Sequence, residues 1–322
     1  MSGPTSSVLY DAPGPRTRRI TLWVSLVAAL AIVAAAYFWI YRPLDEHGQF
    51  TMRKWGPLVD PDHPRFEALW GRLFEGLGNT LLAAVLAIVS SLLFGTALAV
   101  LRVELRSLRR RRYAGIAPPV ALGLRGLTWT LNGITRVCVE VFRGLPVVIT
   151  IFFVGRGLPE FGLDFPVMWY VVIGLTIYNG VVIAEILRSG MTGLPGGQAE
   201  AASALGLSPM QTTRLILLPQ AYRIMLPSLI SQMVVILKDT SLGFLLGYAD
   251  LLNVANQAIN LLNNPIQLYF VVGVIFLAIN YVLSKLAEYT QRRLAARRRA
   301  IGITTGAPGT QLETEAVVGT TT

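Results

Sequence analysis

Five stretches of this chain are apolar over roughly the length of a membrane-spanning helix, and a sixth, Leu145–Leu158, is apolar but shorter. A hydrocarbon core about 30 Å thick is crossed by about 20 apolar residues in a helix. The predicted spans are Ile20–Tyr41, Thr80–Leu101, Leu145–Leu158, Val167–Leu187, Ile224–Tyr248 and Ile266–Leu283. Charged residues make up only 14% of the chain, against roughly 25% in a soluble domain. The sequence therefore predicts an all-α integral membrane fold with six transmembrane helices and excludes an ordinary soluble enzyme.

Two of these spans have irregular beginnings. Arginines precede the first span, as in a secretory signal, but the bulky run Tyr37–Tyr41 continues it and favours a retained anchor. Before the third span, Val137–Phe142 is interrupted by Glu140, and Arg143 and Pro146 then break the helical pattern. We expect a helix along the membrane surface there, then a bend, then the span.

The basic residues are distributed unevenly among the segments that join the spans. The chain has 28 Lys and Arg and a net charge of +10. With the N-terminus inside, 21 of the 28 fall on the cytosolic side, 6 fall outside, and Lys238 lies within a span. This asymmetry predicts that both termini are cytosolic. The run Arg109–Arg112 is read as a topology determinant that also attracts anionic lipid, not as a nucleic-acid site, since no aromatic residues are interleaved with it.

Metal and cofactor chemistry have little support in this sequence. Cys138 is the only cysteine, and His47 and His63 are the only histidines. One cysteine and two histidines exclude a Cys-based zinc site, a His-rich centre and a disulfide framework. We predict that this chain binds no metal and no cofactor.

Three polar segments lie outside the spans. Residues 1–15 and the end of the basic segment 291–322 are predicted to be disordered. The external segment 42–79 ends in an amphipathic stretch, Phe66–Leu77. We expect an interfacial helix there, with Trp70 at the headgroup level; a docking surface for an extracellular partner is the alternative.

The polar segment between the fourth and fifth spans contains two short helix patterns. Gln198–Leu205 is rich in alanine and is followed by Gly206, a residue that favours a helix C-terminus. Ser208–Gln211 is a capping box with proline at the first helical position. Ala201, Ala202 and Ala204 would leave a surface that a partner can approach closely, and Glu200 would supply one charge for an interface. A simple connecting loop is the alternative.

Ionisable and polar residues within the spans are costly in lipid, by roughly 2.5–3.5 kcal/mol for a charge. Lys238 and Asp239 could contact a substrate or tether the helix bundle. The hydroxyls of Thr240 and Ser241 could bond to substrate or to the backbone. The remaining candidates for the pathway are Tyr178 and Asn179, with an interhelical hydrogen bond as the alternative for Asn179.

Three further pairs have structural interpretations. Glu185 and Arg188 are expected to position the following loop, and Glu140 and Arg143 to form a brace or gate before the bend. Gly243 and Gly247 form a Gly-x-x-x-Gly, which permits close helix packing.

The polar segment resembles a known motif. Glu200-Ala201-Ala202, then Gly206, then Ile216-x-Leu218-Pro219 is similar to the EAA loop of bacterial ABC importer permeases. The flanking stretches Val139–Pro146, Tyr178–Gly190 and Leu237–Leu242 resemble the polar amino-acid branch of that family, the glutamate, glutamine and histidine type. The resemblance covers residues 66–290. Residues 16–65 then form an added N-terminal helix and external segment, as in actinobacterial glutamate-type members.

The resemblance implies a type I importer in the bacterial cell membrane, with a five-helix core, one extra helix and cytosolic EAA coupling helices. Two cytosolic ATPase subunits, a second permease subunit and an extracellular amino-acid-binding protein would complete it. Glu200, Ala201, Ala202 and Gly206 would lie at the ATPase contact, and Pro219 would fix the exit into the fifth span. The implied substrate is glutamate, or glutamine or aspartate, with basic amino acids as the alternative.

The energy source follows from a missing motif. No Gly-x-x-x-x-Gly-Lys-Ser/Thr phosphate loop is present, so ATP and Mg would be bound by the partner ATPases. The added first span suggests a heterodimer with a shorter sister subunit. The alternatives are an ion-coupled secondary transporter, which should show inverted repeats that this sequence lacks, and a membrane scaffold, which would not need the EAA loop.

Overall fold

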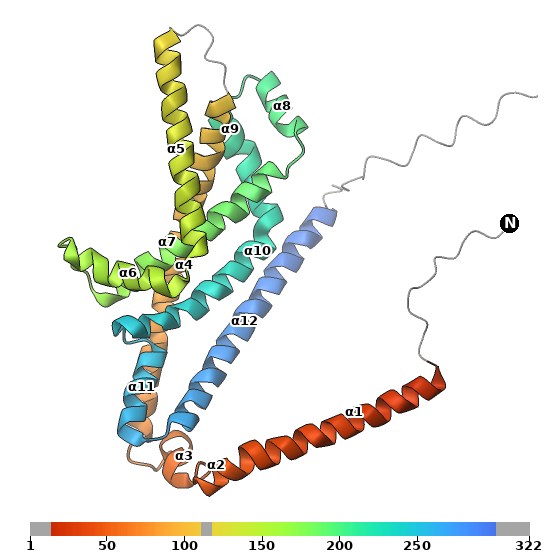
Figure 1. The fold of residues 1–322 in the computed structure, drawn as a ribbon, viewed down its shortest axis with the longest axis vertical. Helices are drawn as coiled ribbons and strands as arrows, with labels where there is room; N and C mark the ends of the chain where they lie inside the picture. The colour runs from red at the N-terminus through yellow and green to blue at the C-terminus, as the bar shows by residue number, and fades with distance from the viewer. Residues whose placement is uncertain (1–13, 111–117, 301–322) are drawn as a thin grey trace, which may run out of the picture. The chain divides into compact units, whose positions relative to one another are not determined.

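The computed structural model describes residues 14–110 and 118–300, and these residues form helices and turns without a strand. Figure 1 shows the helices in chain order. The N-terminal elements are α1 (Pro15–Ala36), the π-helix η1 (Tyr37–Tyr41), α2 (Arg42–Glu46), α3 (Met52–Val59), α4 (Phe66–Arg110), α5 (Pro118–Gly144) and α6 (Val147–Glu160). The later ones are α7 (Val167–Thr192), α8 (Gly197–Ala204), α9 (Pro209–Thr212), the π-helix η2 (Thr213–Leu217), α10 (Leu218–Asp239), the 3₁₀-helix η3 (Thr240–Leu246), α11 (Leu251–Leu262) and α12 (Pro265–Ala300).

The predicted all-α membrane fold is confirmed. Within the described residues, five helical stretches are long and apolar enough to cross a membrane, and the bent pair α5–α6 makes a sixth if it counts as one span. The five are Pro15–Glu46, Phe66–Leu108, Val167–Thr192, Pro209–Leu246 and Pro265–Leu286. The predicted disordered tails fall largely outside the described residues, although α12 continues as helix through the basic segment to Ala300.

The predicted bend before the third span is present, and it is sharp. The axes of α5 and α6 differ by 108° across the break after Gly144. Pro146 stands at the N-cap of α6 in an extended conformation, because a proline restricts its own φ and disfavours helical backbone just before it. With 14 residues, α6 is only about 21 Å long, so it is shorter than the hydrocarbon core.

The chain divides into two compact units, and the smaller one joins the external segment to the start of α12. It comprises the N-terminal part of the chain to Trp70 together with Ala258–Phe270. One glutamine and one asparagine join its two segments. Gln267 Nε2 donates to the carbonyl of Gln49, and Asn264 Nδ2 donates to the carbonyl of Lys54 at 3.0 Å.

The expected interfacial helix at Phe66–Leu77 is wrong. The stretch does not end at Leu77: the helix continues through Gly78, so Phe66–Leu77 is the first part of the 45-residue helix α4. Its apolar face packs against protein, with Leu69 and Leu73 buried. Trp70 is half-buried, and its Nε1 donates to the carbonyl of Leu58 at 3.1 Å.

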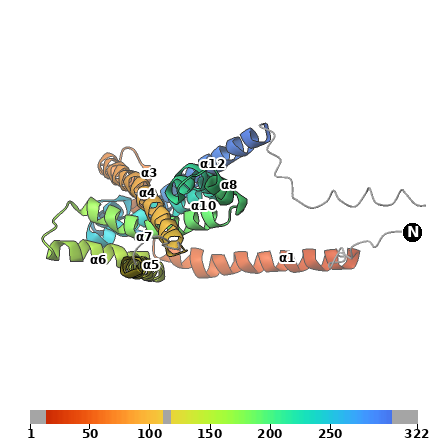
Figure 2. The ribbon, with the colours of Figure 1, turned by 90° about the horizontal axis from the view of Figure 1, so that it is seen from above.

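The larger unit is centred on α7, whose apolar residues are buried on several faces. It contains Gly71–Gln257 and the chain from Val271 onward. In Figures 1 and 2, α7 runs beside α10, with α6 against it, in agreement with their packing. More of the buried core residues come from α7 than from any other helix: Val171, Val172, Leu175, Ile183, Ala184, Leu187 and Met191. This helix is therefore the one that positions the others.

Glycines allow the other helices to approach α7 closely. A Cβ built at Gly95 of α4 would lie 2.7 Å from the carbonyl oxygen of Gly180 and 2.7 Å from Ile183 Cγ2. A Cβ at Gly174 would lie 2.8 Å from the Cα of Ile151 in α6. Such contacts bring backbones together, as small residues do in membrane helix packing.

We predict that Gly95→Ala destabilises the protein, because the added methyl group meets backbone that cannot move aside. Overpacking of this kind costs about 1–3 kcal/mol. Gly78→Ala in the same helix is the matched control, since a Cβ there meets nothing within 4 Å and alanine favours helix. Thermal unfolding of the purified protein in detergent should show a lower Tm for Gly95→Ala only. Equal Tm values for the two variants would contradict the tight α4–α7 crossing.

Candidate functional site

The first candidate site is the segment 193–217, which we call the α8–α9 loop. Helix α8 ends at Ala204 with Leu205 as its C-cap, and Gly206 then adopts φ +77°. The N–H of Leu207 donates to the carbonyl of Ala202 at 3.0 Å across this turn. Side chains with a Cβ rarely adopt this left-handed conformation. The predicted helix with a glycine just beyond its end is confirmed.

The predicted capping box at the start of α9 is also confirmed. Gln211 N–H donates to Ser208 Oγ at 3.3 Å, and Ser208 N–H donates to Gln211 Oε1 at 2.8 Å. The helix does not stop after this turn. It passes through the π-helix η2 into α10, so Pro219 lies exposed in the first turn of α10.

The surface of the α8–α9 loop combines small, charged and large apolar side chains. Glu200 and Ala201 are exposed, whereas Ala202 is buried against the rest of the loop. Leu205 is 81% exposed and Leu215 is 66% exposed. Large apolar side chains in such positions are typical of a surface that a protein partner covers.

Hydrogen bonds anchor the α8–α9 loop to two long helices. Gln220 Nε2 of α10 donates to Gln198 Oε1 of α8 at 2.8 Å. At the root of the loop, Thr213 Oγ1 donates to Glu104 Oε1 of α4 at 2.7 Å. The loop is therefore held as part of the bundle.

A cluster of three charged residues joins α4 to α7 near the root of this loop. Arg102 Nη1 lies 2.6 Å from Glu185 Oε2, and Arg188 binds the same carboxylate through Nε at 3.0 Å and through Nη2. All three side chains are largely buried. From the sequence we expected Glu185 and Arg188 to position the following loop. Sequence analysis missed Arg102, which is a partner of Glu185 from 83 residues earlier in the chain.

The expected brace between Glu140 and Arg143 is not formed. Glu140 Oε1 instead accepts from Arg136 Nε at 2.8 Å, one helical turn back along α5. Residues four apart face each other on a helix, which favours the i,i+4 pair. Arg143 makes no ion pair with the described residues.

The second candidate site is the end of α10, where the predicted pathway residues lie. The α-helix stops at Asp239, which is half-buried, and Lys238 before it is exposed. The hydroxyls that follow bond to the backbone: Thr240 Oγ1 donates to the carbonyl of Leu237 at 2.6 Å and Ser241 Oγ to that of Lys238 at 2.7 Å. We expected these hydroxyls to bond either to substrate or to the backbone, and in this structure they bond to the backbone.

Asn179 forms the interhelical bond that was its alternative interpretation. It is fully buried, its Nδ2 donates to the carbonyl of Leu175 at 3.0 Å, and its Oδ1 accepts from Gln232 Nε2 of α10 at 2.7 Å. Tyr178 beside it is half-buried. Sequence analysis did not identify Gln232 as the partner of Asn179, although a polar amide within an apolar stretch could have pointed to it.

The Gly-x-x-x-Gly interpretation of Gly243 and Gly247 is wrong. Gly247 has φ +79°, ends η3, and would meet nothing within 4 Å if it carried a Cβ. Of the two glycines, only Gly243 is closely packed: a Cβ added there would lie 3.2 Å from Val171 Cγ2. Gly247 is therefore a turn residue.

The turn after Gly247 contains a buried carboxyl group that sequence reasoning also missed. Asp250 caps α11, with Oδ1 accepting from the N–H of Asn253 at 2.7 Å, and its Oδ2 is buried without a hydrogen bond. Bonds from α4 surround it: Asn79 Nδ2 donates to the carbonyl of Ala249, and Thr80 Oγ1 accepts from Leu251 N–H. Burial raises the pKa of Asp250 to about 7, against the opposing effect of its backbone N–H bonds.

The comparisons with known proteins agree with this architecture. Residues 115–296 match the family described as "Binding-protein-dependent transport system inner membrane component". The chain is 37% identical to the glutamate transport system permease protein GluD of Corynebacterium glutamicum, over 82% of this chain and 88% of that protein. It is 34% identical to the probable glutamine ABC transporter permease protein GlnP of Bacillus subtilis, over 70% of this chain and 93% of that protein.

A solved structure has the same fold. A crystal structure of an amino acid ABC transporter with histidines aligns with a TM-score of 0.56 at 24% identity, over 73% of this chain and all of that one.

We predict that Asp250 makes stability depend on pH. An unfolded aspartate has a pKa of about 3.9, so between about pH 4 and 7 the folded protein holds a proton that the unfolded chain releases. The stability contributed by this proton is present below about pH 4 and is lost as the pH rises through about 7. Asp250→Asn keeps a residue suited to capping and should remove this part of the dependence.

The measurement is the Tm of the purified protein at pH 5 and pH 8. The fall in Tm between the two should be smaller in Asp250→Asn than in the wild type. Asp164→Asn, at an exposed aspartate, should behave like the wild type. An unchanged pH dependence in Asp250→Asn would show that this carboxyl does not titrate in that range.

Proposed function

Since the chain belongs to the family of binding-protein-dependent transport system inner membrane components, we propose that it forms the translocation pathway of an ATP-driven importer for glutamate. Glutamine and aspartate are close enough in shape and polarity to share that pathway. Glutamate is preferred because a glutamate permease is 37% identical to this chain over 82% of this chain and 88% of its own length.

The observation that carries this proposal is the exposed α8–α9 loop on a rigid root. A conformational change in an ATPase subunit is transmitted to the membrane helices only if the contacted segment is firmly attached to them. Helix α8 offers Glu200 for an Arg or Lys of a partner, small residues for close approach, and Leu205 as an apolar anchor. Its bonds to α4 and α10 would carry the push into the bundle.

We assign the remaining parts of the importer to other chains. Two ATPase subunits bind ATP and Mg, a second permease subunit completes the pathway as a heterodimer, and an extracellular binding protein delivers the amino acid. This chain itself binds no cofactor. Both termini and the α8–α9 loop lie in the cytosol, because that orientation places 21 of the 28 Lys and Arg inside.

Within the pathway, Lys238 is the residue that we propose to meet a substrate carboxylate. It is exposed at the end of α10 and forms no ion pair with the described residues. Asp239 would meet the ammonium group, and the half-buried Tyr178 would line the path. Thr240 and Ser241 contribute by holding the end of α10, and Asn179 by joining α7 to α10.

The function is tested by reconstituting this chain with its ATPase, its sister permease and its binding protein in vesicles. Uptake of labelled glutamate should require ATP, and Lys238→Gln should lower it at least tenfold, while Lys285→Gln at an exposed lysine of α12 should not. Uptake that follows a proton or sodium gradient without the ATPase would contradict an ATP-driven importer. Uptake of arginine or lysine in place of glutamate would contradict the substrate.

The role of the α8–α9 loop is tested separately. Glu200→Lys reverses the one charge on α8 and should abolish co-purification of the ATPase while leaving membrane insertion intact. Glu160→Lys makes the same change at an exposed residue that ends α6 and should leave co-purification unchanged. Normal assembly of the Glu200→Lys variant would show that α8 is not the ATPase contact.

A further inference from the structure

A cavity of about 620 Å³ between α4, α5 and α7 is lined almost entirely by polar side chains. We call it the arginine pocket, after the five arginines that line it: Arg102, Arg106, Arg136, Arg143 and Arg188. Two carboxylates, Glu140 and Glu185, are the acidic residues among the lining side chains. The pocket therefore carries an excess of three positive charges.

The two carboxylates are already engaged. Glu185 is shared by Arg102 and Arg188, and Glu140 is bound by Arg136. Arg106 and Arg143 form no ion pair with the described residues. They lie on α4 and α5, so two uncompensated guanidinium groups belong to opposite walls of one cavity.

This arrangement leaves α5 weakly attached. Among the described residues, the side-chain hydrogen bonds and the ion pair of α5 have both partners within α5. The arginines of α5 therefore face those of α4 and α7 with a net repulsion. An anion seated between the walls would turn that repulsion into attraction, because guanidinium groups bind phosphate and carboxylate with two parallel bonds.

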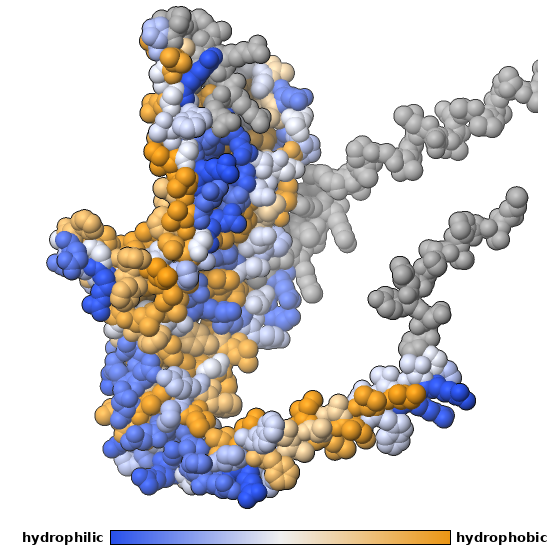
Figure 3. Space-filling view, viewed as in Figure 1, coloured by the Kyte–Doolittle hydropathy of each residue, from blue (hydrophilic) through white to orange (hydrophobic). Residues whose placement is uncertain are grey.

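The surroundings indicate which anion. The faces of α5 turned away from the pocket expose Leu127, Ile134, Val137 and Val141. Trp129 is also exposed, on the pocket side of α5, seven residues before Arg136. In Figure 3, hydrophilic side chains gather along one side of the upper part of α5, and apolar side chains cover the other side. An apolar rim with an exposed tryptophan is typical of a site at the membrane interface. A freely soluble anion would gain nothing from that rim, whereas a lipid would use it for its acyl chains.

We propose that the arginine pocket binds the phosphate headgroup of an anionic phospholipid. Basic pockets between membrane helices are suited to such headgroups. The bound lipid would join α5 to α4 and α7 just before the bend at Gly144. Its assignment to the cytosolic leaflet rests on the proposed orientation, but the binding itself does not.

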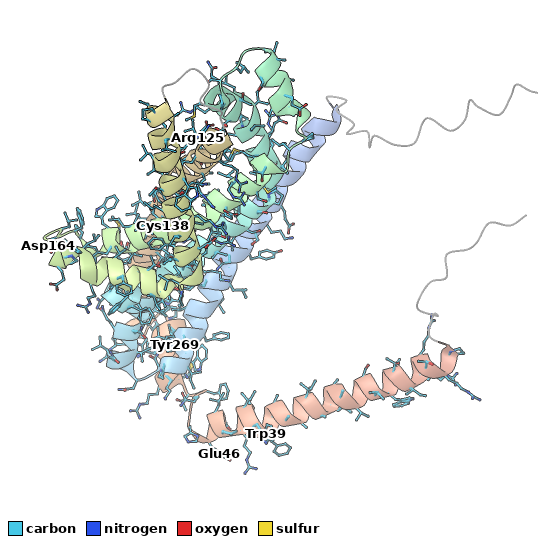
Figure 4. All side chains as sticks on the ribbon, turned by 45° about the horizontal axis from the view of Figure 1, so that its top comes forward. Trp39, Glu46, Arg125, Cys138, Asp164 and Tyr269 are labelled. Atoms are coloured by element: carbon cyan, nitrogen blue, oxygen red, sulfur yellow. The ribbon has the colours of Figure 1, made fainter. Side chains whose placement is uncertain are left out.

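The test is the affinity of phosphatidylglycerol for the purified complex, measured by native mass spectrometry. The double variant Arg106→Gln/Arg143→Gln removes the two unpaired arginines and breaks no ion pair. With about fivefold in affinity for each basic group, it should bind phosphatidylglycerol about 25-fold more weakly. The matched control is Arg125→Gln/Arg156→Gln, at exposed arginines that do not line the pocket; Figure 4 labels Arg125 on α5, apart from Cys138 lower on the same helix.

The control should bind phosphatidylglycerol like the wild type, and neutral phosphatidylcholine should bind all variants equally weakly. Equal phosphatidylglycerol affinity in the wild type and Arg106→Gln/Arg143→Gln would overturn the proposal. Displacement of phosphatidylglycerol by free glutamate would also overturn it, because the pocket would then be an amino-acid site. Binding of inorganic phosphate as tightly as the lipid would show a site for a soluble anion and would overturn it too.

Discussion

A helix in hydrocarbon must satisfy its own backbone hydrogen bonds, so every break in a helix needs a local reason. In the described part of the larger unit, long helical stretches depart from regular α-helix at the bend after Gly144, at the π-helix η2 and at the 3₁₀-helix η3. Each lies at a candidate site, namely the arginine pocket, the α8–α9 loop and the end of α10. At η3 the hydroxyls of Thr240 and Ser241 bind carbonyls of the preceding turn, which is how the break avoids exposing backbone.

The features predicted correctly from the sequence depend either on the length of an apolar stretch or on a few adjacent residues. Hydropathy located the spans because burying some 20 residues in lipid outweighs any other preference. The helix end at Gly206 and the capping box at Ser208 depend on a few adjacent residues and a single backbone angle. These are short-range effects, which adjacent residues are enough to predict.

The features that were missed depend on partners far along the chain. Arg102 is 83 residues from Glu185, and Gln232 is 53 residues from Asn179, so spacing along one helix could not reveal either pair. Trp70 was placed at a headgroup level because its stretch is amphipathic, yet an apolar face packs equally well on protein. Gly247 matched a packing motif only in its spacing, which carries no information on φ.

The bonds that join the helices suggest which part of the bundle moves as one body. Ser90 to Thr176 links α4 to α7, and Asn179 to Gln232 links α7 to α10. Uncharged bonds of this kind contribute about 0.6 kcal/mol each in membrane proteins, and the charged cluster at Glu185 adds to them. Helix α5, joined to this body by packing alone among the described residues, is the helix whose attachment an anion could change.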